Sequence, residues 1–442
     1  MADTPRELAY RTLLDAERNS TRSIDEILSD QLSHSQFSAQ EKAWILELVY
    51  GTTRMKLQLD TWIQSAYTGR YLKAQYAIKV LLRLGVFQLK FMKTAEHAAI
   101  NETVNLSKKV GQKGASRLIN AVLRQIQTRE FDEILDKIND PTEKIAIETS
   151  HPVWMVGNWL ARYETDEVFA LCRHNNTSPQ TWIRRNIQQV DALDFENYFE
   201  RLGVQYQKSN LLEQFYLIDS GAVLLNTSEF HKGYFSFQDL AAGLVANLIH
   251  PREGETIIDA CAAPGGKMAF LSELSRGGSK IIACDASSSR LRRVRQTVER
   301  LKLSQVSIVE LDASADAFTE ADKILLDVPC SGTGVLNRRP DARWRRQPHD
   351  IAALTVIQGK ILLNTWKYLK PGGMLIYATC TLEPSENWDL IDSVLGNLND
   401  AQLEPIEDEK LKPYIDERGA LSTLPWRDGM DGMFAVKIRK MS

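Results

Sequence analysis

The stretch Thr256-Ile-Ile-Asp259-Ala-Cys-Ala-Ala-Pro-Gly-Gly-Lys267 decides the fold of this chain of 442 residues. Its apolar start predicts a buried strand, and its paired glycines predict a tight turn that leads into a helix. Further short apolar runs, separated by helical segments, lie at 280–284, 306–309, 323–326 and 374–377, and a last strand is expected at 432–439. Strands that alternate with helices predict an α/β fold with a parallel sheet and right-handed crossovers.

Two further regions precede this sheet. The first is predicted to be all helix, because Ile78, Leu81, Leu82, Gly85 and Leu89 share one helical face. The second mixes a helical start with strand-like runs at 181–186, 204–206 and 215–218, which is typical of a small α+β module. We therefore expect three domains, with the bounds 1–145, 146–235 and 236–442. Within the last, the acidic stretch 400–416 is expected to be a loop.

Composition limits the classes of function. A net charge of -3 means that any nucleic-acid surface must be local. The start of the chain lacks the apolar core of a signal peptide, and no apolar run is long enough to span a bilayer, so a cytoplasmic protein is expected. The five cysteines contain no Cys-x-x-Cys pair, which argues against a disulfide framework and against a structural zinc site; no metal is expected.

The glycine turn from Cys261 to Lys267 has the form of a ligand site. A phosphate-binding loop needs Gly-x4-Gly-Lys-Ser/Thr, but Cys261 and Met268 occupy its first and last anchors. Asp285 ends the next predicted strand, where an acidic side chain accepts ribose hydroxyls in this architecture. An adenosine-like ribose without a pyrophosphate fits S-adenosylmethionine, with its carboxylate at the glycine turn. A purely structural turn is the alternative.

Two cysteines follow neighbouring predicted strands. Cys330 lies in Asp327-Val-Pro-Cys330-Ser-Gly-Thr-Gly334, and Cys380 lies in Thr379-Cys380-Thr-Leu-Glu-Pro-Ser-Glu386-Asn387. Because both lie in polar loops at the carboxyl ends of strands, both can reach one pocket. The Pro-Cys-x-x-Cys pattern of zinc deaminases is not completed after Pro329. For the other cysteines (172, 261 and 284) a buried, inert thiol is the favoured interpretation.

A thiol beside a methyl donor suits methylation of an unreactive carbon such as cytosine C5. A thiolate that adds to C6 makes C5 nucleophilic, and a base must then remove the C5 proton so that the thiol can leave. An ordinary thiol has a pKa of about 8.5, so a positive neighbour must favour its ionised form. The sulfonium of the donor is the candidate neighbour. Asp327 is expected to hold the amidine edge of the base.

These three motifs together resemble the RNA cytosine-C5 methyltransferases of the Nop2/Sun class, whose catalytic domain is a Rossmann-like class I methyltransferase fold. The resemblance implies that Cys380 is the nucleophile and that Cys330 assists proton removal and product release. Met268 and Thr381 depart from the commoner residues of the family without removing a reactive group. The residues that the resemblance places around the donor and the base are Cys261, Ala262, Ala263, Pro264, Gly265, Gly266, Lys267, Asp285, Asp312 and Asp327.

The resemblance extends to the first two regions. The segments 93–104 and 118–124 look like the NusB-type domain of a bacterial branch that methylates small-subunit ribosomal RNA, and Trp182-Ile-Arg184-Arg-Asn186 looks like its middle segment. This branch implies cytosine 967 of 16S ribosomal RNA as the target. A transfer-RNA cytosine-C5 methyltransferase and a non-catalytic NusB-like RNA-binding factor are the alternatives. A monomer is expected.

An arginine-rich run just after Cys330 is the candidate RNA surface. It contains Arg338, Arg339, Arg343 and Trp344, and we expect the arginines to grip phosphates and the indole to stack on a base. Arg184 is expected to extend this track. A solvated charged face is the alternative interpretation.

Overall fold

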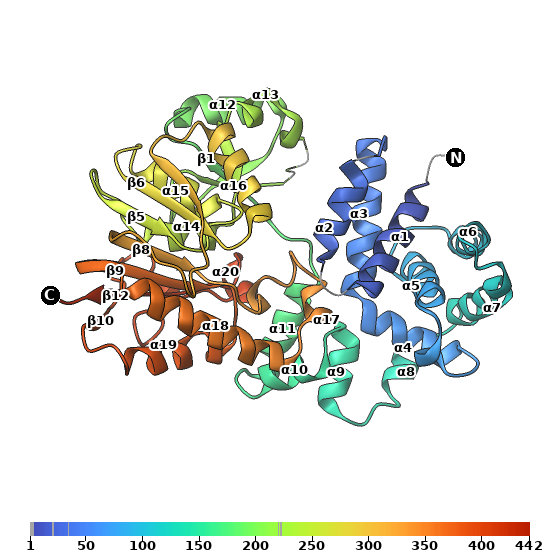
Figure 1. Ribbon diagram of the computed structural model, residues 1–442. Helices are drawn as coiled ribbons and strands as arrows, with labels where there is room; N and C mark the ends of the chain where they lie inside the picture. The colour runs from blue at the N-terminus through green and yellow to red at the C-terminus, as the bar shows by residue number, and fades with distance from the viewer. Residues whose placement is uncertain (1–3, 20–21, 34, 220, 222) are drawn as a thin grey trace. The chain divides into compact units, whose positions relative to one another are not determined.

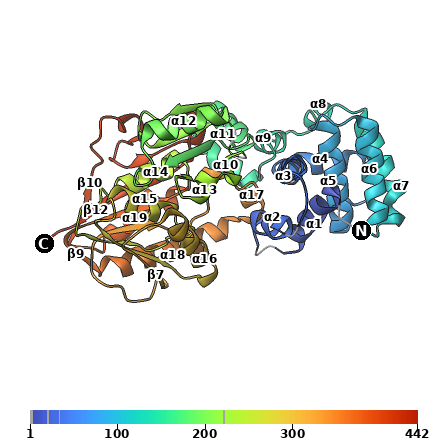
Figure 2. The same ribbon diagram turned by 90° about the horizontal axis from the view of Figure 1, so that it is seen from above.

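The structure, a computed structural model, describes residues 4–19, 22–33, 35–219, 221 and 223–442. The chain divides into two compact units, whose elements are drawn from two directions in Figures 1 and 2. Unit one comprises Met1–Ser178 and Leu336–Arg345, and unit two comprises Pro179–Val335 and Arg346–Ser442. The three domain bounds given above stay a prediction.

Unit one is helical, as expected for the first part of the chain. Capping boxes fix two helix starts, with Thr4 and Glu7 at α1 and with Ser38 and Glu41 at α3. The helical face predicted around Leu81 is buried in the core. The helices are α1 (Pro5–Arg18), α2 (Ile24–Ser33), α3 (Ala39–Arg54), α4 (Lys56–Ala66), η1 (Tyr71–Lys73), α5 (Tyr76–Lys90), α6 (Glu96–Lys109), η2 (Lys113–Ala115), α7 (Ser116–Gln127), α8 (Asp132–Leu135), α9 (Pro141–Thr149), α10 (Val153–Leu160), α11 (Thr165–Asn175) and α17 (Ala342–Arg345).

Unit two begins with a small antiparallel sheet in the order β2-β3-β1-β4. The predicted strands at 181 and 215 are confirmed as β1 (Thr181–Arg185) and β3 (Phe215–Ile218). The strand expected at 204–206 lies later, as β2 (Tyr206–Lys208), because Val204 follows the end of α12 (Ala192–Leu202) and packs in the aromatic core there. The remaining elements are β4 (Phe235–Phe237), η3 (Leu224–Asn226) and α13 (Ser228–His231).

The larger sheet of unit two has the predicted parallel centre. β5 (Thr256–Asp259) pairs in parallel with β6 (Lys280–Asp285) and β8 (Ala321–Asp327). β7 (Val306–Glu310) and β9 (Leu369–Thr379) extend it in parallel on the two sides. β12 (Phe434–Lys440) then pairs antiparallel with β9, and β10 (Ala401–Glu404) and β11 (Leu421–Ser422) pair antiparallel with β12. The expected loop at 400–416 is thus wrong at its start, where β10 forms an edge strand.

Helices cover both faces of this sheet (Figure 1). Ile257 and Ile281 pack with α14 (Leu240–Asn247), α15 (Gly266–Leu274) and α16 (Ser288–Leu301). Ile258 and Ile282 point the other way and pack with α18 (Pro348–Trp366) and α19 (Trp388–Leu395). This alternation follows from the two-residue repeat of a strand. The short elements η4 (Thr333–Val335), η5 (Pro384–Glu386), η6 (Lys412–Tyr414) and α20 (Pro425–Asp428) complete the unit.

Candidate active site

The glycine turn joins the end of β5 to the first turn of α15. Gly265 has a φ of 110°, which an L side chain rarely adopts, and a Cβ on Gly266 would meet only Gln238 atoms at 3.8 Å. The backbone of this turn is therefore open to close approach by a ligand. The guanidinium of Arg184 braces the turn, since Nη1 donates to the carbonyl of Gly266 at 3.0 Å. The N-terminus of α15 suits a carboxylate at this point.

Two of the predicted donor-site acids lie at or beyond the ends of the next strands. Asp285 is the last residue of β6, and its Oδ1 accepts from the amide of Ser287 at 2.9 Å and pairs with Arg290 at 2.8 Å. Asp312 lies two residues beyond β7, which ends at Glu310. Its exposed carboxylate accepts from the amide and hydroxyl of Ser314, which lowers the pKa of Asp312.

A lysine and two carboxylates meet beside the turn. Lys267 Nζ lies 2.8 Å from Asp327 Oδ2, and the attraction of Asp327 raises the pKa of Lys267 even though burial, the largest influence, opposes this. Asp259 is almost fully buried, and in the described part of the chain no side chain donates a hydrogen bond to its carboxylate oxygens, although the backbone amide of Cys261 acts to lower its pKa. Burial, followed by the charge of Asp327, raises the pKa of Asp259 to about 7. The site thus holds more negative than positive charge, which suits a cationic ligand.

The structure brings the two thiols of the loops together. Cys330 Sγ lies 3.2 Å from Cys380 Sγ, and the amide of Cys380 donates to Cys330 Sγ at 3.3 Å. The hydrogen bond with Cys380 and then burial raise the pKa of Cys330 well above its usual range. A thiolate at Cys380 also attracts the ammonium of Lys267. The arrangement therefore favours a thiolate at Cys380 and a neutral thiol at Cys330, and Lys267 is the positive charge that this chain supplies beside them.

A buried acid that the sequence reasoning did not single out links the two loops. Glu386 accepts from the Ser331 amide at 2.8 Å, from the Ser331 hydroxyl, and from Thr381 Oγ1 at 3.0 Å. Gln358 of α18 donates to the same carboxylate at 2.9 Å. Because Ser331 follows Cys330 and Thr381 follows Cys380, Glu386 fixes the residue next to each thiol. Glu386 lies in the Cys380 motif quoted above, and this position is the sequence signal that could have identified it.

The predicted RNA-binding arginines occupy different surroundings. Arg184 is fully buried in unit two and pairs with Glu273 at 2.7 Å. Arg343 is fully buried in unit one, where it donates to the carbonyls of Ser150 at 3.1 Å and Asn175 at 2.9 Å. Neither guanidinium can reach a phosphate in this structure, so burial corrects the expectation that these two arginines grip RNA.

The neighbours of Arg343 are more accessible. Trp344 is half-buried, and its Nε1 donates to the carbonyl of Thr53 at 2.6 Å. Arg338 is half-buried and Arg339 is exposed. In the predicted run, Arg339 is thus the residue whose exposure best suits contact with phosphate.

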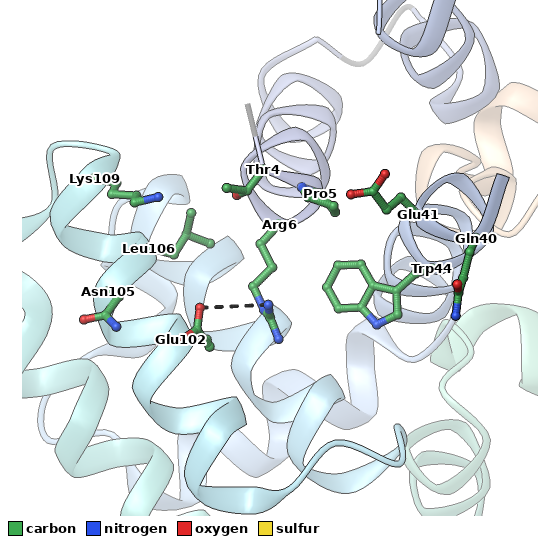
Figure 3. Close-up of a pocket in the computed structure, with 10 residues that line it drawn as sticks. All are labelled: Thr4, Pro5, Arg6, Gln40, Glu41, Trp44, Glu102, Asn105, Leu106 and Lys109. Atoms are coloured by element: carbon green, nitrogen blue, oxygen red, sulfur yellow. Dashed lines mark ion pairs between the residues drawn. The ribbon is translucent and has the colours of Figure 1, made fainter. Parts of the chain in front are cut away.

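A cavity of about 410 Å³ in unit one is formed without any of the predicted site residues (Figure 3). It is lined by α1, α3 and α6, and Arg6 lies over the ring of Trp44 with 5.0 Å between the guanidinium carbon and the ring centroid. Among the described residues, no group of three or more His, Cys, Asp or Glu side chains is arranged to hold a metal ion. No helix among them is both long and apolar enough to cross a bilayer.

Three families match successive parts of the chain. The family described as 16S rRNA methyltransferase RsmB/F matches residues 246–439, the NusB family matches 3–128, and the Methyltr_RsmF/B-like, ferredoxin-like domain matches 151–222. The last match covers the end of unit one from residue 151 and, in unit two, the strands β1, β2 and β3 of the small sheet. The three matches occur in the order that the sequence predicts.

Similar proteins span the full length of the chain. It is 33% identical to the probable ribosomal RNA small subunit methyltransferase B of Bacillus subtilis, over 98% of each chain. It is 34% identical to the ribosomal RNA small subunit methyltransferase B of Erwinia tasmaniensis, over 93% of this chain and 94% of the relative. The crystal structure of PH0851 has the same fold, with a TM-score of 0.83 over 100% of both chains at 22% identity.

Proposed function

We propose that this chain, which belongs to the RsmB/F family of 16S rRNA methyltransferases, methylates C5 of one cytosine in small-subunit ribosomal RNA through a covalent Cys380 adduct. Membership makes it an S-adenosylmethionine-dependent rRNA methyltransferase. The finer assignment, cytosine 967 and the adduct, is our proposal. The observation that carries it is the 3.2 Å separation of the two thiols.

The residues of the glycine turn fit the donor. Gly265 and Gly266 leave the backbone open at the start of α15, where the amino-acid carboxylate of the donor would lie. Asp285 would accept the ribose hydroxyls, and Asp312 would lie near the adenine. When bound there, S-adenosylmethionine supplies the methyl group. The excess of acidic side chains around Lys267 favours a ligand with positive charge.

Cys380 is the proposed nucleophile. Its sulfur forms a bond to C6 of cytosine, and the displaced electron pair makes C5 able to take the methyl group. Lys267 favours the thiolate that starts this step. Asp327, held by Lys267 at 2.8 Å, would accept a hydrogen bond from the exocyclic amine of the base.

Cys330 is the proposed base for the C5 proton. Its pKa is raised chiefly by Cys380, so formation of the Cys380–C6 bond removes that influence and makes Cys330 easier to ionise. Cys330 then loses its proton to solvent and accepts the C5 proton. The electron pair of the C5–H bond re-forms the C5–C6 double bond of the cytosine. The bond from Cys380 to C6 breaks, and Cys380 leaves as a thiolate. A ribosomal RNA substrate also supports a cytoplasmic location for this protein.

Changing Cys380 to Ala tests the nucleophile. Methyl transfer to 16S ribosomal RNA should fall by at least about a thousandfold, because addition to C6 is lost. Donor binding, measured by calorimetry, should stay within about twofold, since Cys380 is not part of the glycine turn. Bisulfite sequencing of the RNA should show an unmodified target. Methylation at the wild-type rate in this variant would refute the adduct.

Changing Cys330 to Ala tests the release step. The variant should accumulate protein joined to RNA that survives denaturing electrophoresis, because the C5 proton is no longer removed. Changing Cys172 to Ala provides the matched control, since that thiol is buried in unit one, whereas both loops belong to unit two. If Cys330→Ala turns over normally without an accumulated adduct, Cys330 has no part in release.

A further inference from the structure

We infer that Asp259 makes the donor site selective for the cationic donor over the neutral product, because among the described residues no side chain donates a hydrogen bond to its buried carboxylate at the end of β5. The inference rests on the proposed function, since it concerns the methyl donor of that same site. It assigns a specificity-determining role to a residue outside the predicted donor contacts.

The surroundings of Asp259 disfavour its ionised form. Its side chain is 1% exposed, and an unpaired buried carboxylate is costly to ionise. Each neighbouring strand contributes a further acid at its end, Asp285 from β6 and Asp327 from β8. The thiol of Cys261 lies in the turn that follows, and its pKa is raised by burial and by the charge of Asp259.

The cations around Asp259 are committed to other acids. Lys267 of α15 lies 2.8 Å from Asp327, and Arg290 of α16 lies 2.8 Å from Asp285. Lys267 and the backbone amide of Cys261 lower the pKa of Asp259, but burial and the charge of Asp327 outweigh them and raise that pKa to about 7. Near neutral pH, Asp259 is therefore protonated in about half of the molecules when the site holds no ligand. A cation placed beside it would remove that proton.

The donor and the product differ in the charge that Asp259 would meet. S-adenosylmethionine carries a sulfonium, whereas the thioether that remains after transfer is neutral; both carry the same ribose and amino-acid groups. When the sulfonium stabilises the Asp259 carboxylate, donor binding is linked to release of the Asp259 proton. At a pH above the pKa of the free site, each unit by which the donor lowers the pKa of Asp259 strengthens donor binding about tenfold. The product gains nothing from this link, so it binds more weakly and leaves.

Titration calorimetry of the full chain in buffers of different ionisation enthalpy tests this link. Donor binding should release close to one proton per site at pH 6, roughly half at pH 7 and almost none at pH 8, in excess of the release caused by S-adenosylhomocysteine. The shared amino group cancels in this difference. Donor affinity should rise from pH 6 to pH 8, while product affinity should stay level or change only as the shared groups dictate.

Asp259→Asn should abolish the excess proton release and reduce the preference for donor over product by about a hundredfold at pH 8, because near-complete release at pH 6 requires that the donor lowers the pKa of Asp259 by about two units. Glu320→Gln, which removes an exposed carboxylate of the same unit, should leave both unchanged. Binding of S-adenosylhomocysteine by Asp259→Asn would show that the variant is folded. If the variant does not fold, the pH series on the wild-type chain tests the inference by itself. Equal proton release for donor and product in the wild type, or an unchanged excess in Asp259→Asn, overturns the inference. Failure of both ligands to bind the wild type overturns the proposed function itself.

Discussion

Glu386 is fully buried, and it accepts hydrogen bonds from both loops that carry the thiols. In Glu386→Gln, an amide NH₂ in place of Oε1 would face the Ser331 amide and the Gln358 amide, which are both donors, and in place of Oε2 it would require the hydroxyls of Ser331 and Thr381 to turn and accept. Because buried hydrogen bonds to charged groups are worth about 1.5–3 kcal/mol, we expect the free energy of unfolding to fall by roughly 2–4 kcal/mol. We also expect slower methyl transfer, since the residues next to both thiols lose a common acceptor. Chemical denaturation and single-turnover kinetics measure these two effects.

Glu417→Gln is the matched control, because Glu417 is an exposed acid of the same unit. It should change neither stability nor rate. If Glu386→Gln were as stable and as active as this control, Glu386 would not organise the thiol loops.

At the scale of single residues, the sequence predicts which side chains come together, but it does not predict the hydrogen bonds and ion pairs between them. The end positions of β8 and β9 follow from two apolar runs, and these place Cys330 and Cys380 at one edge of the sheet. The pairing of Lys267 with Asp327 joins residues 60 apart in the chain, and no local pattern encodes it. The same holds for Asp259, whose charge depends on acids from two other strands.

At the scale of elements, the Cys380 loop is held by close backbone contact. The amide of Gly334 donates to the carbonyl of Cys380 at 3.1 Å, and the amide of Gly432 donates to the carbonyl of Gly334 at 2.9 Å. A Cβ on Gly334 would lie 2.3 Å from the carbonyl oxygen of Gly432 and 3.0 Å from that of Cys380. Only glycine fits here without displacing one of the two backbones.

Gly334→Ala should therefore shift the Cys380 loop and lower the rate of methyl transfer by about a hundredfold, as expected for a misplaced reactive group. Donor affinity should change little, because the glycine turn lies on another loop. Gly359→Ala is the control, since its new Cβ would only touch Val394 at 3.9 Å in the middle of α18. That variant should keep full activity and gain up to about 1 kcal/mol from helix propensity. Equal activity of the two variants would contradict the steric argument.

Elements were predictable where a local signal was strong. The five central strands follow from apolar runs, and the helices of unit one follow from their buried stripe. β10 was not predicted, because its residues, 401–404, include only two apolar side chains and lie in an acidic stretch. It forms as an edge strand through its pairing with β12, which also supplies Lys437 to Glu404 at 2.8 Å. Such pairing with a strand more than thirty residues away leaves no pattern in the edge strand itself.

At the scale of the whole molecule, the order of the chain differs from its division into units. Leu336–Arg345 follows the Cys330 loop in sequence but belongs to unit one. Within that unit, Arg343 donates to Ser150, Asn175 and, at 2.8 Å, to the Asn176 side chain. The sequence shows an arginine-rich run, which is usually solvated, and the partners that bury Arg343 lie more than 160 residues earlier.

Arg343→Met keeps an unbranched stem and removes the guanidinium, so these three acceptors lose a donor in a buried place. We expect unit one to lose roughly 2–4 kcal/mol of stability, because unsatisfied buried polar groups are costly. Hydrogen exchange should then quicken for amides of α9 and α11, which end at the affected carbonyls, while β5 and β6 of unit two keep their protection. Arg339→Met, an exposed neighbour in the same run, should leave exchange unchanged and should instead weaken RNA binding at low salt if Arg339 contacts phosphate. Unaltered exchange in α9 and α11 of Arg343→Met would show that this segment does not stabilise unit one.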